Sequence, residues 1–186
     1  RNPLTFYGIV AESNTIKDWY TSSNSAADQN NHLWGGNPGE DKSVFDPCPE
    51  GWRLPVGNSG SLTNSKPSPW YGGTSEATDF ATYAPTWYPD GAYFKNIAYN
   101  LGWYPKTGYR ISHEFSGQPV QVGDFINQGY GGYYWMGSYY KNAVGFGDAL
   151  AEVFEIIYHD LSPESVIRTN NVIFRSYGAN VRCVKE

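Results

Sequence analysis

The fold is decided by the stretch Lys42-Ser-Val-Phe-Asp-Pro-Cys-Pro-Glu-Gly-Trp-Arg-Leu-Pro55. It joins loop-forming residues to a short strand pattern, and it holds Cys48, one of the two cysteines of the chain. The other cysteine, Cys183, lies in the stretch Gly178-Ala-Asn-Val-Arg-Cys-Val184, where a further strand is predicted over residues 179–184. Whether Cys48 and Cys183 are joined determines whether these two stretches lie side by side in the fold.

The two cysteines form either a disulfide or a pair of buried thiols. They are too distant in the sequence for the close spacing of zinc ligands. In the last predicted strand Ala179, Val181 and Cys183 share one face, so Cys183 is expected to point inward. If the protein is exported, a bridge between an early strand and the last strand is favoured, and it would stabilise the fold by about 4–5 kcal/mol in the chain-entropy model.

The composition favours strands and turns over long helices. The 186 residues include 16 Tyr, 7 Trp, 9 Phe and 21 Gly, which is typical of a β-rich chain, and their number suits one domain with its own core. The 13 Lys and Arg residues are scattered singly and the net charge is -5, which excludes a nucleic acid partner.

No apolar run reaches the roughly 18–20 residues that a membrane span needs, and no basic and apolar leader precedes Arg1. We interpret residues 1–186 as one domain, the C-terminal part of a longer surface protein. We expect a leader, a lipid anchor or further domains in the upstream region of that longer protein.

Strand patterns outnumber helical patterns along the chain. The predicted strands cover residues 4–10, 51–54, 133–137, 150–158, 172–175 and 179–184. Two short helical patterns span residues 24–31 and 75–83, the second beginning at Ser75 and ending before Pro85. Between residues 55 and 132 Gly, Ser, Asn, Pro and Tyr dominate, so we expect long loops there that aromatic side chains hold in place.

The stretch around Cys48 resembles the DPCPxGWRxP signature of a family of Bacteroidetes surface proteins related to the Fibrobacter succinogenes major paralogous domain. Further matches follow in the order that this family shows. They are Asn2-Pro-Leu-Thr-Phe6 with Asp18-Trp-Tyr20, Leu33-Trp-Gly35, Tyr104-Pro-Lys-Thr-Gly-Tyr-Arg110, Gly131-Gly-Tyr-Tyr-Trp135 and Gly178-Ala-Asn-Val-Arg-Cys-Val184. The resemblance spans nearly the whole chain, with a cysteine motif towards each end.

This resemblance implies an exported module at a cell surface or on a fimbria. It also implies an α+β fold, mostly β with long ordered loops, similar to C-type lectin-like domains. Many relatives continue from the signature into a helix, but residues 56–64 have loop chemistry here, so the helix on the lectin-like sheet is expected to begin near Ser75. The calcium-dependent sugar motifs of animal C-type lectins are absent, and we assign no metal and no cofactor.

The candidate ligand-binding residues lie in the loops of the C-terminal third. Tyrosine offers a wide contact area with few rotatable bonds, and asparagine both donates and accepts hydrogen bonds, so both suit recognition. The candidates are Tyr139, Tyr140, Asn142, His159, Asp160, Asn170 and Asn171, the last two in a predicted turn. Because Tyr139 and Tyr140 are adjacent, only one ring can face inward. In the alternative interpretation that ring completes the core and the other shields a strand edge.

The tryptophans fall into two groups. Those in strand-like or motif segments, which we expect in the core, are Trp52, Trp103 and Trp135. Trp34, Trp70 and Trp87 lie among Gly, Asn and Pro, where an exposed indole can stack on a sugar face. For this second group, anchoring of the surrounding loop is the favoured alternative.

An enzyme would need a base, a nucleophile or a pair of carboxylates. His32, His113 and His159 are isolated from serine and cysteine motifs. The carboxylates that could supply a glycosidase pair are Asp124, Asp148, Glu152, Glu155, Asp160 and Glu164, for which solvated or turn-capping roles are favoured. Glu152 and Glu155 fall on opposite faces of one predicted strand, so at least one must lie at an edge or have a partner.

We therefore predict a non-catalytic, adhesion-type module on the outside of a bacterial cell. Its predicted ligand is a glycan or a host or bacterial surface protein, bound by the Tyr- and Asn-rich loops. The alternatives are a structural fimbrial or surface-assembly subunit and a glycan-cleaving enzyme.

Overall fold

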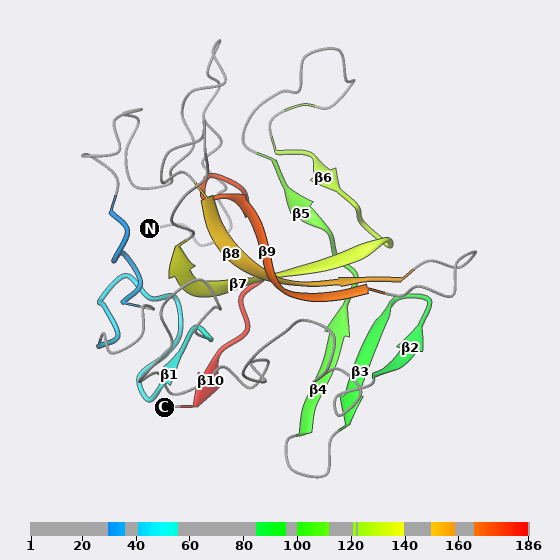
Figure 1. The fold of residues 1–186 in the computed structure, drawn as a ribbon, viewed down its shortest axis with the longest axis horizontal. Coiled ribbons are helices and arrows are strands. Elements are labelled where there is room, and N and C mark those ends of the chain that lie inside the picture. The colour runs from blue at the N-terminus through cyan, green and yellow to red at the C-terminus, as the bar shows by residue number, and fades with distance from the viewer. Residues whose placement is uncertain are drawn as a thin grey trace.

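A computed structural model describes residues 30–35, 41–55, 85–95, 100–111, 121, 123–139, 150–158 and 166–185. In these residues the chain forms ten strands, which pair antiparallel in four sheets (Figure 1). The strands are β1 Trp52–Arg53, β2 Thr86–Tyr88, β3 Gly91–Lys95, β4 Asn100–Pro105, β5 Tyr109–Arg110, β6 Phe125–Ile126, β7 Gly131–Tyr139, β8 Leu150–Ile157, β9 Val166–Phe174 and β10 Val184–Lys185.

The predicted α+β fold of the C-type lectin-like kind is wrong for the described part of the chain, which contains strands and no helix. The helical pattern over residues 75–83 and the strand pattern over residues 4–10 lie outside the described residues. Of the pattern over residues 24–31 only Asn30 and Asn31 are described, and neither is helical. A small sheet, β2–β3–β4, forms in residues 86–105, where loops were expected, and in β3 Ala92 and Phe94 are buried while Tyr93 and Lys95 are not, which is the period of a strand.

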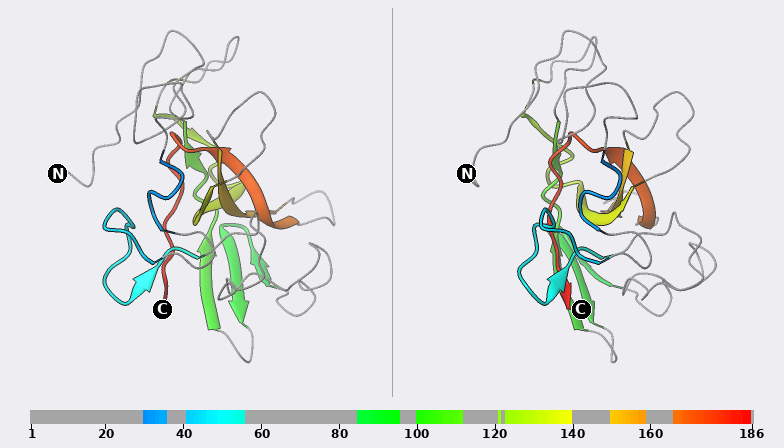
Figure 2. Two further views of the ribbon diagram at one scale, coloured as in Figure 1. Left: turned by 60° about the vertical axis from the view of Figure 1, so that its left-hand side comes forward. Right: turned by 90° about the vertical axis from the view of Figure 1, so that its left-hand side faces the viewer.

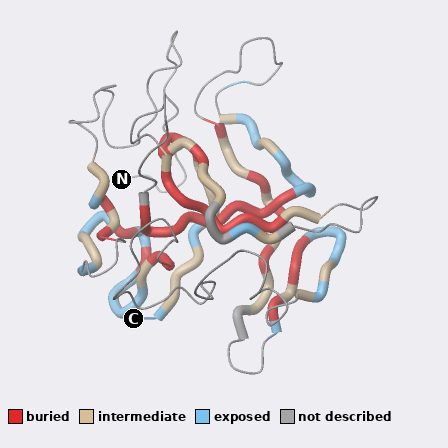
Figure 3. The backbone as a smooth tube through the Cα atoms, in the orientation of Figure 1, coloured by how far each residue is buried: buried red, intermediate tan, exposed pale blue. Residues whose placement is uncertain are grey.

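The central sheet has the order β7-β8-β9 and is buried on both faces, as the burial colouring of Figure 3 shows. Alternate residues of β7 serve two separate core clusters. Tyr133 and Trp135 belong to one, and Tyr134 and Met136 to the other. The predicted strands over residues 133–137 and 150–158 are thereby confirmed.

The sheet β2–β3–β4 packs on one of these faces, and its strands run across those of the central sheet (Figure 1). Its buried side contributes Ala92, Phe94 and Tyr104 to the core. The Tyr104 ring contacts Tyr134 and Phe154 edge to face, with ring centroids 4.8 and 5.6 Å apart. Such aromatic contacts fix the small sheet on the central one.

The other face of the central sheet is covered by the segments that carry the cysteines. β1 pairs with β10, and a disulfide joins Cys48 to Cys183 with their Cα atoms 5.7 Å apart. Figures 1 and 2 show β1 and β10 side by side from each direction. The predicted disulfide is confirmed, although Cys48 lies in the loop before β1 and Cys183 immediately before β10, and Cys183 packs inward against the core as expected.

The last segment is less regular than the strand predicted over residues 179–184. Only Val184–Lys185 pairs as a strand, and Val181 is 46% exposed instead of buried. Asn180 ties the segment to the free edge of β7 instead. Its N–H donates to the Tyr133 carbonyl (2.9 Å), its side-chain amide donates to the same oxygen (2.9 Å), and its own carbonyl accepts from the Trp135 N–H (2.8 Å).

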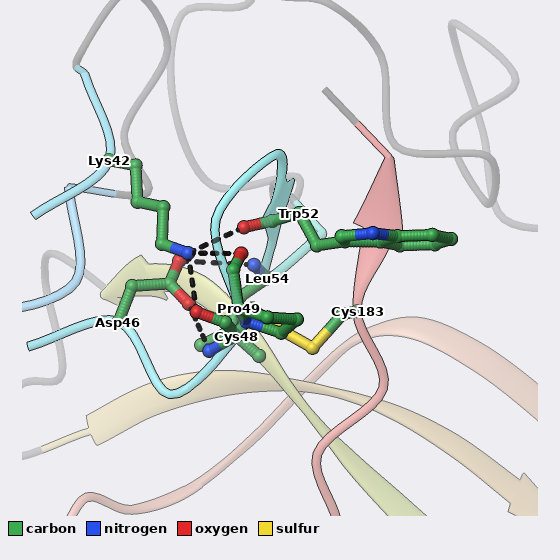
Figure 4. The surroundings of a disulfide bond; sticks show 7 residues. All are labelled: Lys42, Asp46, Cys48, Pro49, Trp52, Leu54 and Cys183. Carbon is green, nitrogen blue, oxygen red and sulfur yellow. Dashed lines mark hydrogen bonds between the residues drawn. A yellow bond between two sulfur atoms is a disulfide. The ribbon is translucent and has the colours of Figure 1, made fainter.

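In the signature around Cys48, the side chains of Lys42 and Asp46 form hydrogen bonds to the surrounding backbone (Figure 4). The buried Asp46 carboxylate accepts from the N–H of Cys48 (2.7 Å) and the N–H of Leu54 (3.1 Å). The Lys42 ammonium donates to the carbonyls of Cys48, Pro49 and Trp52 at 2.5, 2.7 and 2.7 Å. These two side chains provide hydrogen-bond partners for backbone groups of a loop, which has no neighbouring strand to pair with. The signature therefore has a structural role here.

We expect Asp46→Ala to destabilise the protein by roughly 2–3 kcal/mol, because it leaves two N–H groups beside the disulfide without their charged acceptor. Urea unfolding followed by tryptophan fluorescence measures this loss. Asp46→Asn keeps an acceptor for only one of the two N–H groups, so it should lose stability too, but less than Asp46→Ala. Equal stability of Asp46→Ala and wild type would contradict the structural role.

Candidate ligand-binding surface

The sheet β2–β3–β4 has an outer face opposite to the one that packs on the core. The residues that alternate onto this face are Thr86, Tyr88, Gly91, Tyr93, Lys95, Trp103 and Pro105. Thr86, Tyr93 and Trp103 form one row across the three strands through the pairs Thr86↔Tyr93 and Tyr93↔Trp103. Tyr88 lies in the next row, opposite Gly91.

The indole of Trp103 lies across Gly91. A Cβ atom at position 91 would be 2.6 Å from Cζ2 and 2.9 Å from Cη2 of the indole, so a side chain there would displace the ring. Tyr88 meets Trp103 edge to face with centroids 5.4 Å apart. Tyr88 is 45% exposed, while Tyr93 and Trp103 are half-buried. We call Tyr88, Tyr93 and Trp103 the aromatic face.

Arg182 fixes β4 from the C-terminal segment. Its Nη1 donates to the Trp103 carbonyl at 2.7 Å, and its guanidinium carbon lies 4.3 Å from the centre of the Tyr104 ring. Burial raises the pKa of the Tyr104 phenol, and the charge of Arg182 opposes this with a smaller effect. The arginine of the closing motif thus positions the strand that carries Trp103.

An aromatic face of this kind combines flat apolar rings with polar edges. The rings of Tyr88 and Trp103 offer surface for the C–H-rich faces of sugars, and the neighbouring phenol and Thr86 hydroxyl groups offer hydrogen bonds. Because these rings already contact one another and the sheet beneath, little rotamer freedom is lost when a ligand binds. The arrangement therefore suits recognition of an extended sugar chain.

Most residues of the predicted loop site cannot be placed. Tyr140, Asn142, His159 and Asp160 lie outside the described residues, and for Tyr139 and Asn170 only the backbone is described. Asn171 is half-buried in β9, opposite Val153 of β8. The turn predicted at Asn170 and Asn171 is wrong, because both residues lie within β9, where an irregularity in the ladder accommodates them.

The described neighbours of these residues lie at two ends of the central sheet. Tyr139 pairs with Ala151 near the start of β8, whereas Tyr158 follows the opposite end of that strand. The rise of a strand puts these ends roughly 20 Å apart. The described residues therefore do not bring the two groups of predicted site residues together, and a single loop site stays a prediction.

Three of the tryptophans differ from the prediction. Trp52 is 43% exposed and Trp103 half-buried, so of the three expected core residues only Trp135 is buried. Trp87 lies in β2, not in a loop, and stacks on Tyr158 with centroids 5.7 Å apart. Trp34 packs edge to face on Trp135, as the anchoring alternative predicts. Trp70 lies outside the described residues.

Sequence reasoning missed the aromatic face because it assigned the region to loops. A signal was present in Thr86-Trp-Tyr-Pro-Asp-Gly-Ala-Tyr-Phe-Lys95, where two aromatic runs flank a Pro-Asp-Gly turn. In the structure this stretch is the β2–β3 hairpin, with only Pro89 and Asp90 between the paired residues Tyr88 and Gly91.

A second candidate site is the hollow beside the end of β7. It is lined by Asn30, Asn31, Leu33, Trp34, Gly137, Ser138, Ala151 and Arg175. The buried Arg175 guanidinium hydrogen-bonds the Asn31 side-chain oxygen and the Leu150 carbonyl. The enclosed space holds about one water molecule, so the hollow is too small for a sugar or a peptide side chain.

The described carboxylates have structural surroundings. Glu155 is buried beside the cross-strand residue Tyr133, and its Oε2 lies 2.8 Å from Nη1 of Arg168, which provides the expected partner. Glu152 is fully buried on the opposite face of β8, so it does not form a pair with Glu155. Asp124 caps a turn by accepting from the Gln121 N–H at 2.8 Å. These positions favour structural roles over glycosidase chemistry.

Comparisons of the chain with protein-family models, curated proteins and solved structures found no match in any of the three. Within the described ranges, no helix is long and apolar enough to cross a membrane. The same residues contain no group of three or more His, Cys, Asp or Glu side chains placed to hold a metal ion.

Proposed function

We propose that this protein is a non-catalytic, adhesion-type binding module that recognises a glycan through the aromatic face of β2–β3–β4. The observation that carries this proposal is the pair of outward rings, Tyr88 and Trp103, with the indole laid across Gly91. Tyr88 is 45% exposed and contacts the half-buried Trp103, and this paired arrangement on one sheet face supports a binding surface where a single exposed ring would not.

We further propose that the module acts outside a bacterial cell. The Cys48–Cys183 disulfide supports this, because such bridges persist in oxidising compartments and are rare in the cytosol. A protein ligand and a structural fimbrial role remain the competing functions, and both predict no binding to free sugar chains.

We expect Trp103→Ala to weaken glycan binding roughly 30-fold, because truncation of a central aromatic anchor costs about 2 kcal/mol. Tyr88→Ala is expected to weaken binding by roughly fivefold to tenfold, and Tyr88→Phe should bind almost as wild type if stacking dominates. The measurement is a glycan-array screen followed by isothermal titration calorimetry with the glycan that binds best.

Trp52→Ala is the matched control, since Trp52 is an exposed tryptophan on β1, away from the β2–β3–β4 sheet. Near-ultraviolet circular dichroism checks that each variant is folded, and Tyr88→Ala tests the same face if Trp103→Ala does not fold. Unchanged affinity in both Tyr88→Ala and Trp103→Ala, or a loss in Trp52→Ala of the same size, would rule out this face.

A further inference from the structure

Beside the aromatic face, the outer side of β2–β3–β4 carries a cation, Lys95, although the chain as a whole is acidic. The chain has 18 acidic and 13 basic residues, yet the strand positions that alternate onto this face carry one cation, Lys95, and no carboxylate. Asp90, the acidic residue of the β2–β3 hairpin, lies in its turn at the far end from Lys95. The face is therefore asymmetric, with aromatic rings towards the turn and a positive charge at the other end.

Lys95 lies in line with the rings along β3. Side chains on one face of a strand repeat every two residues, so Lys95 follows Tyr93 by about 7 Å and Gly91, beneath the Trp103 indole, by about 13 Å. Lys95 is exposed, and no carboxylate among the described residues forms an ion pair with it. Its charge is available to a ligand that extends from the rings along the strand.

We propose that the aromatic face binds an acidic glycan, a sugar chain with carboxylate or sulfate groups. The chain lies along β3, with sugar rings stacked on Trp103 and Tyr88 and an acidic group beside the Lys95 ammonium. This inference rests on the proposed glycan-binding function and adds the charge of the ligand. Complementary charge favours acidic over neutral chains and guides the ligand to one orientation on the face.

The test uses an array with oligogalacturonates, sulfated glycosaminoglycan fragments and neutral cello-, xylo-, manno- and chito-oligosaccharides. The wild-type protein is expected to bind acidic members best, and more weakly as the salt concentration rises, since exposed charges are screened. Lys95→Gln should lose roughly threefold to fivefold in affinity for the acidic ligands and retain its affinity for neutral ones. Lys185→Gln, at another exposed lysine on β10, is the matched control and should bind as wild type.

The outcomes separate the two proposals. Trp103-dependent binding in which neutral oligosaccharides are preferred, or in which Lys95→Gln binds acidic ligands as well as wild type, overturns the acidic ligand and leaves the glycan-binding function standing. Binding of no glycan, or binding unaffected by Trp103→Ala and Tyr88→Ala, overturns both. A comparison of uronate and sulfate members of the array identifies which acidic group binds beside Lys95.

Discussion

Replacing Cys48 and Cys183 together by serine is expected to lower the free energy of unfolding by about 4–5 kcal/mol. The bridge joins residues 135 positions apart in the sequence. In the chain-entropy model its removal raises the conformational entropy of the unfolded chain, which stabilises the unfolded state by this amount. The effect should be large because the bridge also holds β1 against β10, a pair of only two residues in each strand. Chemical denaturation of the oxidised wild type and the double variant measures the difference.

Chemical reduction of the wild type is the independent arm of this experiment, and it should reproduce the loss seen in the double variant. Mass spectrometry without reductant should find no thiol available for alkylation in the native protein. A double variant as stable as the wild type would show that the packing around Leu54 and Tyr177 closes the chain without the bridge.

Alkaline pH is expected to unfold the protein over a narrow range that begins near pH 10. Burial is the first cause of a raised phenol pKa at five positions, with the charge of Glu155 adding to it at Tyr109 and Tyr133. These positions are Tyr104, Tyr109, Tyr133, Tyr134 and Tyr177. A phenol whose pKa is raised in the folded state contributes stability that is complete below pH 10. That stability is lost as the pH rises, because only the unfolded chain then ionises.

A phenol that stays protonated in the folded state and ionises in the unfolded chain lowers the free energy of unfolding by at most about 1.4 kcal/mol per pH unit, a slope that is reached about one unit above pH 10. Urea denaturation at pH 8, 10 and 10.5, combined with absorbance of the phenolate at 295 nm, measures both stability and ionisation. Tyr177→Phe should make the loss of stability above pH 10 smaller, because one buried phenol no longer contributes to it. A phenolate signal below pH 11 that Tyr177→Phe lowers while the protein is still folded would contradict the buried position of Tyr177.

The parts of the fold that the sequence predicts correctly are those where one short pattern decides the structure. Residues 133–137 and 150–158 have too many apolar and aromatic side chains for any surface strand, and they form the buried centre, β7 and β8. For the two cysteines the sequence left a disulfide and a pair of buried thiols as alternatives, with the disulfide favoured in an exported protein, and the structure has the disulfide.

Other parts depend on contacts between distant segments. Asn170 and Asn171 have turn chemistry, yet β8 continues beside them and the ladder keeps both in β9. Trp52 belongs to a motif segment, but β1 is a two-residue edge strand that leaves the indole 43% exposed. The aromatic face was missed for a third reason, since each of its strands is short and only their pairing creates a surface.

Three features hold the small sheet β2–β3–β4, which carries the proposed binding face, in position. Phe94 and Tyr104 pack its inner side onto the central sheet, Arg182 ties β4 to the last segment, and the disulfide fastens that segment to β1. The closing motif thereby links the covalent bridge to Trp103. In the proposed function, a sheet held in this way keeps the aromatic face in place for its ligand.

Nuclear magnetic resonance tests this claim most directly, through backbone amide shifts recorded while an oligosaccharide identified on the array is added. The account predicts that the shifted amides cluster in β2, β3 and β4, with Tyr88, Tyr93, Lys95 and Trp103 among the largest changes. Shifts confined to residues 139–142 and 159–171, with β2–β4 unchanged, would contradict it and return the ligand to the loops of the C-terminal third.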